Sequence, residues 1–403
     1  MRASEIRKLI QIKPAELDAT RRRLSACHDI ADLCATARRL TPRPVFDFVD
    51  GGADEELSVR ANARAFRRWQ FRPRTLVNVS QADTSAAFLG SVVPLPLALA
   101  PTGYTRMVHP AGEIAAARAA QRHGLPYTLS TMATTGIEEL RAAVGPAAEL
   151  WFQLYLTKDR GQAYALVDRA RDSGYTALVV TVDTVVAGNR VRDLRNGLSI
   201  PPALTLRTVA SVGARPGYWY RLLSGPALDY ANFAGGPRTT VMKTAHFFDA
   251  NLNWDDIAEL RARWSGKLLL KGPVGPADAL RAAELGLDGV QLSNHGGRQL
   301  DRTVAPADLI APVREAVGPS FTVLVDSGIR HGADIAIAIA LGADAAVPGR
   351  AYPYGLMAGG EAGVDRALDL LSGQFRSTMQ FLGMTSVAEL RKHGRDLITR
   401  TAE

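Results

Sequence analysis

The chain has 403 residues, of which 47% are apolar and 22% are charged, and its formal net charge is +8. These proportions are typical of a globular protein and exclude a disordered, a collagen-like and a disulfide-scaffold chain. The basic residues are scattered among acidic ones apart from a run at 21–23, and no nucleic-acid-binding motif accompanies them, so we expect no nucleic-acid partner.

We expect no segment that spans a membrane or directs secretion. The first residues are charged throughout and lack the apolar core of a secretory signal. The longest apolar stretch, 91–101, contains Pro94 and Pro96 and is shorter than the roughly 18 residues that a spanning helix needs. The two cysteines, Cys27 and Cys34, are too few for a disulfide framework. A cytoplasmic protein is the simplest interpretation.

In chain order, residues 1–75 predict helices and loops without a buried-strand pattern. From residue 76 onward, short apolar runs alternate with longer amphipathic stretches. The runs are almost continuously apolar, which is typical of parallel strands buried on both faces. Eight such strands are expected, at 95–100, 126–130, 150–155, 177–183, 267–271, 289–294, 322–326 and 345–349.

Most of these strands precede a stretch with helical periodicity. These helices are expected at 113–123, 137–144, 160–173, 276–285, 306–317, 332–341 and 361–381. Eight strand–helix units in succession predict an α/β fold, a closed (β/α)8 TIM barrel with right-handed crossovers. We therefore divide the chain into an N-terminal helical and loop cap at 1–75 and a barrel at 76–403.

A long insertion follows the fourth strand, at about 184–253. Its length is too great for a passive connection, so it predicts either a lid over the active site or a segment that docks on a membrane. Three consecutive aromatic residues, Tyr218, Trp219 and Tyr220, suit an interface. The basic residues that accompany them are Arg207, Arg215, Arg221, Arg238 and Lys243, against the single acid Asp229.

In a barrel of this kind, reacting groups lie where the strands end and the βα loops begin. The seventh strand ends in DSGIR at 326–330, and the eighth ends in GR at 349–350. Glycines there let backbone N–H groups approach an anion, and each loop supplies an arginine. This pattern predicts a phosphate site, whereas the alternative is two ordinary glycine turns.

Lys271 ends an apolar strand, which is a costly place for an ammonium group without an anionic partner. Two chemical roles would justify the position. The amine can stabilise negative charge on a cofactor ring, or it can form a Schiff base. A structural ion pair is the alternative.

His295 follows a strand end and precedes Gly296 and Gly297, so a substrate can come close to its imidazole. Arg298 lies three residues on and can bind a carboxylate with two parallel hydrogen bonds. We interpret His295 as catalytic, with a core histidine as the alternative. Asp183 can orient the imidazole across the barrel, or it is a turn residue. No pair of histidines has metal-ligand spacing, so no metal is expected.

The string SNHGGRQLD at 293–301 resembles the signature of the FMN-dependent L-2-hydroxy-acid dehydrogenase and oxidase family, which includes glycolate oxidase, L-lactate dehydrogenase and mandelate dehydrogenase. The overall pattern resembles the bacterial quinone-linked L-lactate dehydrogenases in particular. The family's barrel is the one predicted above. The resemblance extends from about 41 to 385 through the strings GGA (51–53), APTG (100–103), WFQLY (151–155), TVD (181–183), NGLSIPPALT (196–205), VD (325–326) and GGEAG (359–363).

This resemblance implies FMN as the cofactor. It places Lys271, which it also counts as catalytic, near flavin N1, where negative charge develops as the ring is reduced. The other cofactor-binding residues that it implies are Thr102, Gly103, Ser130, Gln153, Thr181, Ser293, Asp326, Ser327, Gly328, Arg330, Gly349 and Arg350.

On the substrate side, the resemblance implies that Arg190 and Arg298 bind the carboxylate and that Tyr155 hydrogen-bonds the hydroxyl or keto oxygen. His295 is then the catalytic base, with Asp183 behind it.

The sequence departs from the family pattern in three places. Phe48 stands where the family usually has a tyrosine that binds the carboxylate, and Met132 stands where glycolate oxidase has tryptophan. The loss of the tyrosine hydroxyl at Phe48 puts lactate in doubt and favours a longer or more apolar substrate side chain, and Met132 gives a different pocket wall. Gly103 stands where many oxidases have alanine, which favours a dehydrogenase.

The expected function is therefore FMN-dependent oxidation of an L-2-hydroxy acid, either L-lactate or a larger homologue such as mandelate, to the 2-keto acid. Electrons would pass to a quinone, with peripheral docking on an anionic inner membrane face, or to another acceptor. One alternative is an oxidase that uses O2 and releases H2O2. Others are a flavin-free Schiff-base aldolase or isomerase on a phosphorylated substrate and a non-catalytic docking protein. The resemblance also implies a homotetramer.

Overall fold

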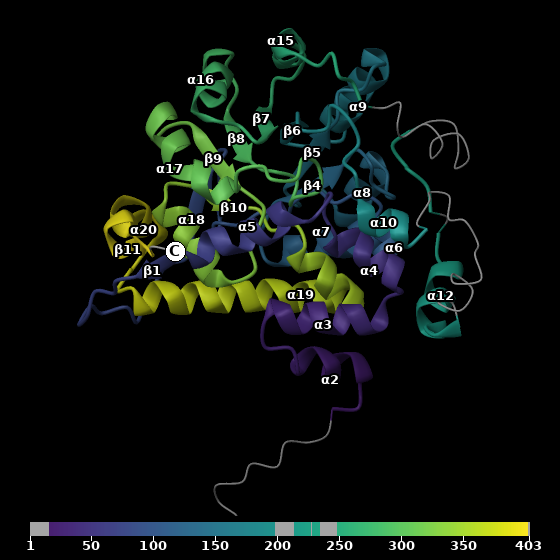
Figure 1. Ribbon diagram of the computed structural model, residues 1–403, viewed down its shortest axis with the longest axis horizontal. Coiled ribbons are helices and arrows are strands. Elements are labelled where there is room, and N and C mark those ends of the chain that lie inside the picture. The colour runs from purple at the N-terminus through teal and green to yellow at the C-terminus, as the bar shows by residue number, and fades with distance from the viewer. Residues whose placement is uncertain (1–15, 198–212, 227, 234–247, 402–403) are drawn as a thin grey trace, which may run out of the picture.

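The computed structural model describes residues 16–197, 213–226, 228–233 and 248–401 (Figure 1). Its centre is a parallel sheet of seven strands in the order β10-β9-β8-β7-β6-β5-β4. The strands are β4 (Tyr127–Ser130), β5 (Leu150–Leu154), β6 (Ala177–Thr181), β7 (Lys267–Gly272), β8 (Gly289–Leu292), β9 (Thr322–Val325) and β10 (Ala345–Ala346).

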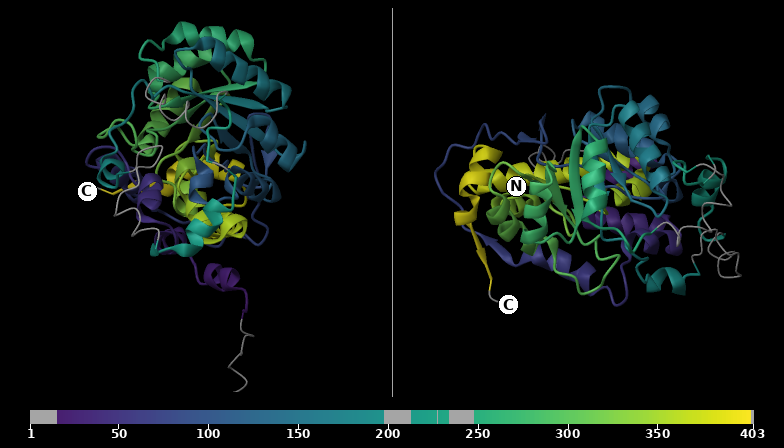
Figure 2. Two further views of the ribbon diagram at one scale, coloured as in Figure 1. Left: turned by 90° about the vertical axis from the view of Figure 1, so that its right-hand side faces the viewer. Right: turned by 90° about the horizontal axis from the view of Figure 1, so that it is seen from above.

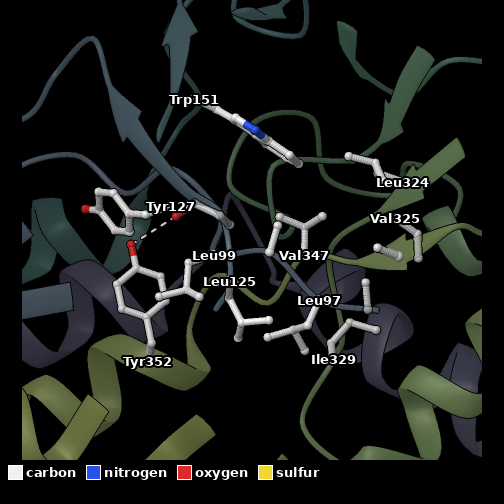
Figure 3. Packing of buried hydrophobic residues seen from close by; sticks show 14 of the residues in the cluster. Leu97, Leu99, Leu125, Tyr127, Trp151, Leu324, Val325, Ile329, Val347 and Tyr352 are labelled. Carbon is white, nitrogen blue, oxygen red and sulfur yellow. Dashed lines mark hydrogen bonds between the residues drawn. The ribbon is translucent and has the colours of Figure 1, made fainter. Parts of the chain in front are cut away.

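The segment predicted as the first strand, 95–100, closes the barrel between the two edges of this sheet. Leu97 pairs with Ala346 of β10, and Leu99 pairs with Tyr127 of β4, both in parallel bridges. The Leu97 and Leu99 side chains belong to the buried core beside both edges (Figure 3). The (β/α)8 fold predicted from the sequence is therefore confirmed.

Helices surround the sheet in both views of Figure 2. The helices of the barrel are α7 (Gly112–Arg122), α8 (Ile137–Val144), α9 (Arg160–Asp172), α15 (Trp254–Arg263), α16 (Pro276–Glu284), α17 (Pro306–Val317), α18 (Gly332–Ala340) and α19 (Ala351–Phe381), with the short α6 (Thr105–Val108) before α7.

The last barrel helix differs from the prediction of a helix at 361–381. The helical segment α19 begins at Ala351, directly after the eighth strand, and is kinked at Gly359 and Gly360, whose backbone angles are not helical. The two parts of α19 pack closely because a Cβ on Gly363 would lie 1.9 Å from the Gly355 carbonyl oxygen. Glycine-rich sequence normally disfavours a helix, and tertiary packing overrides that preference here.

The N-terminal segment forms α2 (Ala19–Ser25), α3 (Ile30–Leu40), α4 (Arg43–Asp50) and α5 (Leu57–Arg67). In Figure 1, α3 lies along α19 at the side of the barrel. Strand β1 (Trp69–Phe71) pairs antiparallel with β11 (Ile398–Arg400), so the segment predicted as a separate cap is joined to the C-terminal end of the chain. The hairpin of β2 (Ala86–Phe88) and β3 (Ser91–Val93) follows, and α20 (Val387–His393) and the 3-10 helix η1 (Gly394–Leu397) precede β11.

The insertion contributes α10 (Val191–Arg195) and α12 (Pro216–Leu223). Helix α12 lies at the edge of the molecule in Figure 1. Arg207, Arg238 and Lys243, which were singled out above, lie outside the described residues. Within the described ranges, no helix is both long enough and apolar enough to cross a membrane.

Candidate active site

A cavity of about 450 Å³ lies where the barrel strands end and their following loops begin. It lies within the range of about 300–1,000 Å³ that is typical of ligand sites. The residues predicted from the sequence that line it are Phe48, Thr102, Gly103, Ser130, Met132, Gln153, Tyr155, Thr181, Arg190, Lys271, His295, Arg298, Asp326, Ser327, Gly328, Arg330, Gly349 and Arg350.

Two further predicted residues, Asp183 and Ser293, lie directly behind this lining and contact His295. The Asp183 Oδ1 atom is 3.0 Å from His295 Nδ1. The Ser293 hydroxyl accepts a hydrogen bond from the His295 backbone N–H at 3.0 Å. The structure thus places Ser293 beside the histidine rather than on the cavity wall.

The loop at 293–301 is held against the N-terminal segment. Asn294 and Asn62 exchange two amide hydrogen bonds of 2.8 and 2.7 Å. The Asp301 carboxylate accepts hydrogen bonds from the backbone N–H groups of Leu57 and Ser58. These groups lie in the first turn of α5, where the helix itself provides no acceptor. Residues from α5 and the turn before it therefore support the loop that carries His295.

His295 is held in the left-handed region, with φ of +57°. Burial lowers the pKa of its imidazole, and the Asp183 carboxylate opposes this effect only in part, so the net pKa lies below the ordinary value. For Asp183, burial raises the pKa, but the interaction and hydrogen bond with the His295 ring and the positive charge of Lys271 outweigh burial and keep the carboxyl group ionised. The pair is therefore a neutral imidazole beside a carboxylate at neutral pH.

Two arginines predicted to bind a carboxylate line the cavity with His295. Arg298 donates from Nη1 to the carbonyl oxygens of Phe48, at 2.5 Å, and Gly51, at 3.1 Å. Its guanidinium also lies over the Phe48 ring, 5.2 Å from the ring centre. The Nε atom of Arg190 is buried and has no hydrogen-bond partner among the described residues. These groups provide positive charge for an anion inside the cavity.

A row of polar groups crosses three neighbouring strands. The Ser130 hydroxyl at the end of β4 donates to Gln153 Oε1 in β5 at 3.0 Å. Gln153 Nε2 in turn donates to the Thr181 hydroxyl in β6, also at 3.0 Å. These bonds set the orientation of the Gln153 amide, so the row presents fixed polar atoms to the cavity.

Lys271 has an anionic partner, because its Nζ lies 3.9 Å from Asp326 Oδ2. The Asp326 carboxylate also accepts hydrogen bonds from Gln291, at 2.7 Å, and from the Ser327 hydroxyl, at 2.6 Å. The ion pair considered from the sequence is present, and the ammonium group still lines the cavity. The ion pair with Asp326 is therefore compatible with a chemical role for the Lys271 ammonium group.

The two arginines of the predicted phosphate site have different surroundings. Arg350 donates from all three of its nitrogens to the carbonyl oxygens of Val49, Gly296 and Gly51, at 2.8 to 2.9 Å. Arg330 donates from Nη1 to the Ile329 carbonyl and lies over the Tyr354 ring. The Arg350 guanidinium is thus occupied by backbone carbonyl oxygens. Arg330 has more N–H groups than Arg350 that are left to bind an anion.

Sequence reasoning missed an aromatic and apolar part of the lining. Tyr104 and Tyr230 are in ring contact, with centres 5.1 Å apart, and Phe248 meets the Tyr155 ring edge to face at 5.9 Å. Tyr230 and Phe248 belong to the insertion, where no periodic pattern indicates which side chains point inward. Val108 and Asp193 also line the cavity.

Comparisons with known proteins agree with this architecture. Residues 37–397 match the family described as FMN-dependent dehydrogenase. The chain is 46% identical to a putative L-lactate dehydrogenase of Mycobacterium tuberculosis strain H37Rv over 389 residues, which cover 96% of this chain and 94% of the relative. It is 41% identical to an L-lactate dehydrogenase of Caulobacter vibrioides, with 90% and 95% of the two chains covered.

Solved structures are similar as well. The monotopic membrane protein (S)-mandelate dehydrogenase superposes with a TM-score of 0.89 at 36% identity, over 93% of this chain and all of the other. A mandelate oxidase superposes with a TM-score of 0.78 at 36% identity, over 91% and 98% of the two chains.

Proposed function

Because the chain belongs to the FMN-dependent dehydrogenase family, we propose that it oxidises an L-2-hydroxy acid to the 2-keto acid with FMN as cofactor. One observation carries the proposal: the neutral His295 beside Asp183 shares a cavity with Arg190 and Arg298. A base and two carboxylate-binding groups are what this substrate class requires.

The donor set of the cavity fits FMN. Arg330 and the loop backbones at Gly328 and Gly349 suit the phosphate, and the row at Gln153 with the Lys271 ammonium suits the polar edge of the ring. When bound, FMN supplies the two-electron acceptor of the reaction. The family match removes the flavin-free aldolase and the docking protein as alternatives.

The chain's own residues orient the substrate and accept a proton. Arg190 and Arg298 bind the carboxylate, and this orientation can lower the barrier by several kcal/mol. Burial raises the pKa of Tyr155, so its hydroxyl stays protonated and donates to the substrate oxygen. His295 accepts the proton at Nε2, because its Nδ1 faces Asp183, and the carboxylate stabilises the resulting imidazolium.

The direct test is spectroscopic. We expect the purified protein to hold FMN and its visible absorbance to bleach under anaerobic addition of an L-2-hydroxy acid but not of the D enantiomer. A colourless protein, or a flavin that no member of a panel from L-lactate to L-mandelate bleaches, would overturn the proposed function.

For the substrate side chain, we propose a preference for bulky apolar groups over the methyl of lactate. The support is the wall made by Tyr104, Tyr230, Phe248 and Met132 and the absence of a hydroxyl on Phe48. Phe48→Tyr is expected to raise kcat/KM for L-lactate by about two- to tenfold, because a hydrogen bond to a carboxylate contributes roughly 0.5–1.5 kcal/mol.

Steady-state kinetics with L-lactate and L-mandelate measure this effect. The matched control is Phe381→Tyr, since Phe381 is 80% exposed at the end of α19. Unchanged lactate kinetics in Phe48→Tyr, or a wild type that prefers lactate, would contradict the preference.

For the acceptor, we propose a quinone and peripheral docking through α12 on the inner face of the membrane. A membrane-associated structural neighbour supports this, as do the exposed side chains of Tyr220 and Leu223, at 76% and 80%. Tyr218 faces inward and donates its hydroxyl to the Met107 carbonyl, so it belongs to the folded body rather than to an interface. The lid interpretation of the insertion is supported by Tyr230 and Phe248 on the cavity wall.

Replacing Tyr220 and Leu223 together with serine is expected to lower binding to anionic vesicles at least several-fold without changing flavin content. Vesicle sedimentation measures the binding, and Phe381→Ser is the control for loss of an exposed aromatic. Equal sedimentation of the variant and the wild type argues against docking through α12.

Gly103 supports a dehydrogenase over an oxidase, and reoxidation of the bleached protein by a soluble quinone analogue rather than by O2 is the expected result. We also propose the homotetramer that the family resemblance implies. Light scattering would then give four times the chain mass of 43.3 kDa.

A further inference from the structure

We propose that Gln299 is a positioning residue that holds Asp183 against His295. The inference rests on the proposed function, because it assigns a role inside that site. Gln299 belongs to the loop after β8, and its side chain reaches the loop after β6. Gln299 is not itself one of the residues that line the cavity, so it would act through Asp183.

The Gln299 amide is oriented by two acceptors. Its Nε2 donates to the backbone carbonyl of Asp183 at 3.2 Å and to that of Val186 at 3.0 Å. A carbonyl cannot donate, so the amide nitrogen has to face this loop. The opposite atom, Oε1, is then buried without a hydrogen-bond partner among the described residues. Leaving a buried acceptor unsatisfied is unfavourable, so the two donated hydrogen bonds are what hold the amide in this orientation.

The two loops are in direct contact beside this amide. A Cβ on Gly188 would lie 2.3 Å from the Arg298 carbonyl oxygen and 3.0 Å from Gln299 Oε1. The loop after β6 therefore packs against the loop that carries His295, with the Gln299 side chain beneath residues 183 to 186. Removing the two donors releases the backbone of Asp183 while leaving the β-strands untouched.

Asp183 depends on such support because its carboxylate has few contacts of its own. Oδ1 meets His295 Nδ1, whereas Oδ2 is buried without a partner in the part of the chain that the structure describes. A single hydrogen bond to the imidazole does not fix the orientation of the carboxylate group. The peptide group of Asp183, held by Gln299, supplies the remaining constraint.

The charge around His295 determines what a displaced Asp183 would do. The charged groups acting on the imidazole are Asp183 from the loop after β6, Lys271 from β7 and Arg190 from the insertion. Of these three, Asp183 favours the protonated imidazole, and Lys271 and Arg190 oppose it together with burial. If Asp183 moves away, the pKa of His295 falls and the imidazole becomes a weaker base.

The test compares the holoenzyme of the wild type with Gln299→Met, which keeps the side-chain length and removes both donors. We expect kcat/KM at its pH plateau to fall about ten- to hundredfold, as for other groups that orient a reacting residue. The acid limb of the pH profile should move to lower pH. NMR of labelled histidines, with His295→Gln to assign the signal, should show the same fall in pKa without any turnover.

A double-mutant cycle with Asp183→Asn separates the proposed route from general damage. If Gln299 acts through Asp183, adding Gln299→Met to Asp183→Asn should change the rate less than about twofold. An equal loss in both backgrounds, or an unchanged His295 pKa in Gln299→Met, overturns the proposal.

Gln299→Leu covers the case in which the methionine variant does not fold, because it also removes both N–H donors and adds no charge beside His295. Gln380→Met is the matched control, since Gln380 also donates to a carbonyl, that of Val79, away from the cavity. Failure of the wild type to bleach would overturn the proposed function alone, while the NMR titration still tests Gln299.

Discussion

Replacing His295 with Gln is expected to lower the rate of flavin reduction by about 10² to 10⁴, the usual contribution of a positioned general base. Glutamine keeps a polar side chain opposite Asp183 but cannot accept the substrate proton. The rate is measured as anaerobic bleaching in a stopped-flow instrument. Because the chemical step is affected, kcat should fall much more than KM rises.

The matched control is His393→Gln, at an exposed histidine at the end of α20, which should react like the wild type. The wild-type pH profile is a second check. A base has to be deprotonated, and burial lowers the pKa of His295, so the midpoint of the acid limb of kcat/KM should lie below the ordinary pKa of a histidine. Asp183→Asn should move this limb lower still. A limb above pH 7, or a His295→Gln variant that retains most of its rate, would contradict the assignment.

Replacing Arg298 with Met is expected to lower kcat/KM for 2-hydroxy acids by about 10² to 10³, because truncating one member of a buried charged pair costs roughly 2–5 kcal/mol. Arg298 is half-buried, and its desolvation together with the neighbouring Arg190 and Arg350 lowers its pKa. An anionic substrate relieves the repulsion among these arginines. The loss in kcat/KM should therefore be seen with substrates that carry a carboxylate. Steady-state kinetics across substrate concentration measure it.

A neutral 2-hydroxy amide is the substrate control, since Arg298→Met should affect its poor turnover far less than that of the acid. Arg302→Met is the variant control, because Arg302 lies in the same loop but forms an exposed pair with Glu55. If Arg298→Met lowered the rates of the acid and the amide equally, the arginine would act by holding the Phe48 and Gly51 carbonyls rather than by binding the substrate.

The loop at 293–301 and the N-terminal segment that holds it differ in how readily the sequence reveals them. The string at 293–301 is visible as a motif, but the reason for its length appears only in the fold. Asn294 pairs with Asn62, and Asp301 meets the start of α5, more than 200 residues away in the chain. A motif thus predicts that its residues matter, while their partners follow from packing.

By itself, the sequence determined the barrel and the location of the site. Strands buried on both faces must be continuously apolar, and a parallel barrel brings every strand end to one rim, so residues such as Lys271, His295 and Asp326 had to meet there. Only the tertiary structure decided that α19 begins before Gly359 and that the side chains of Tyr230 and Phe248 point into the cavity. It also decided the hydrogen-bond partners of Arg350 and Gln299. These depend on contacts between distant segments, for which local periodicity carries no information.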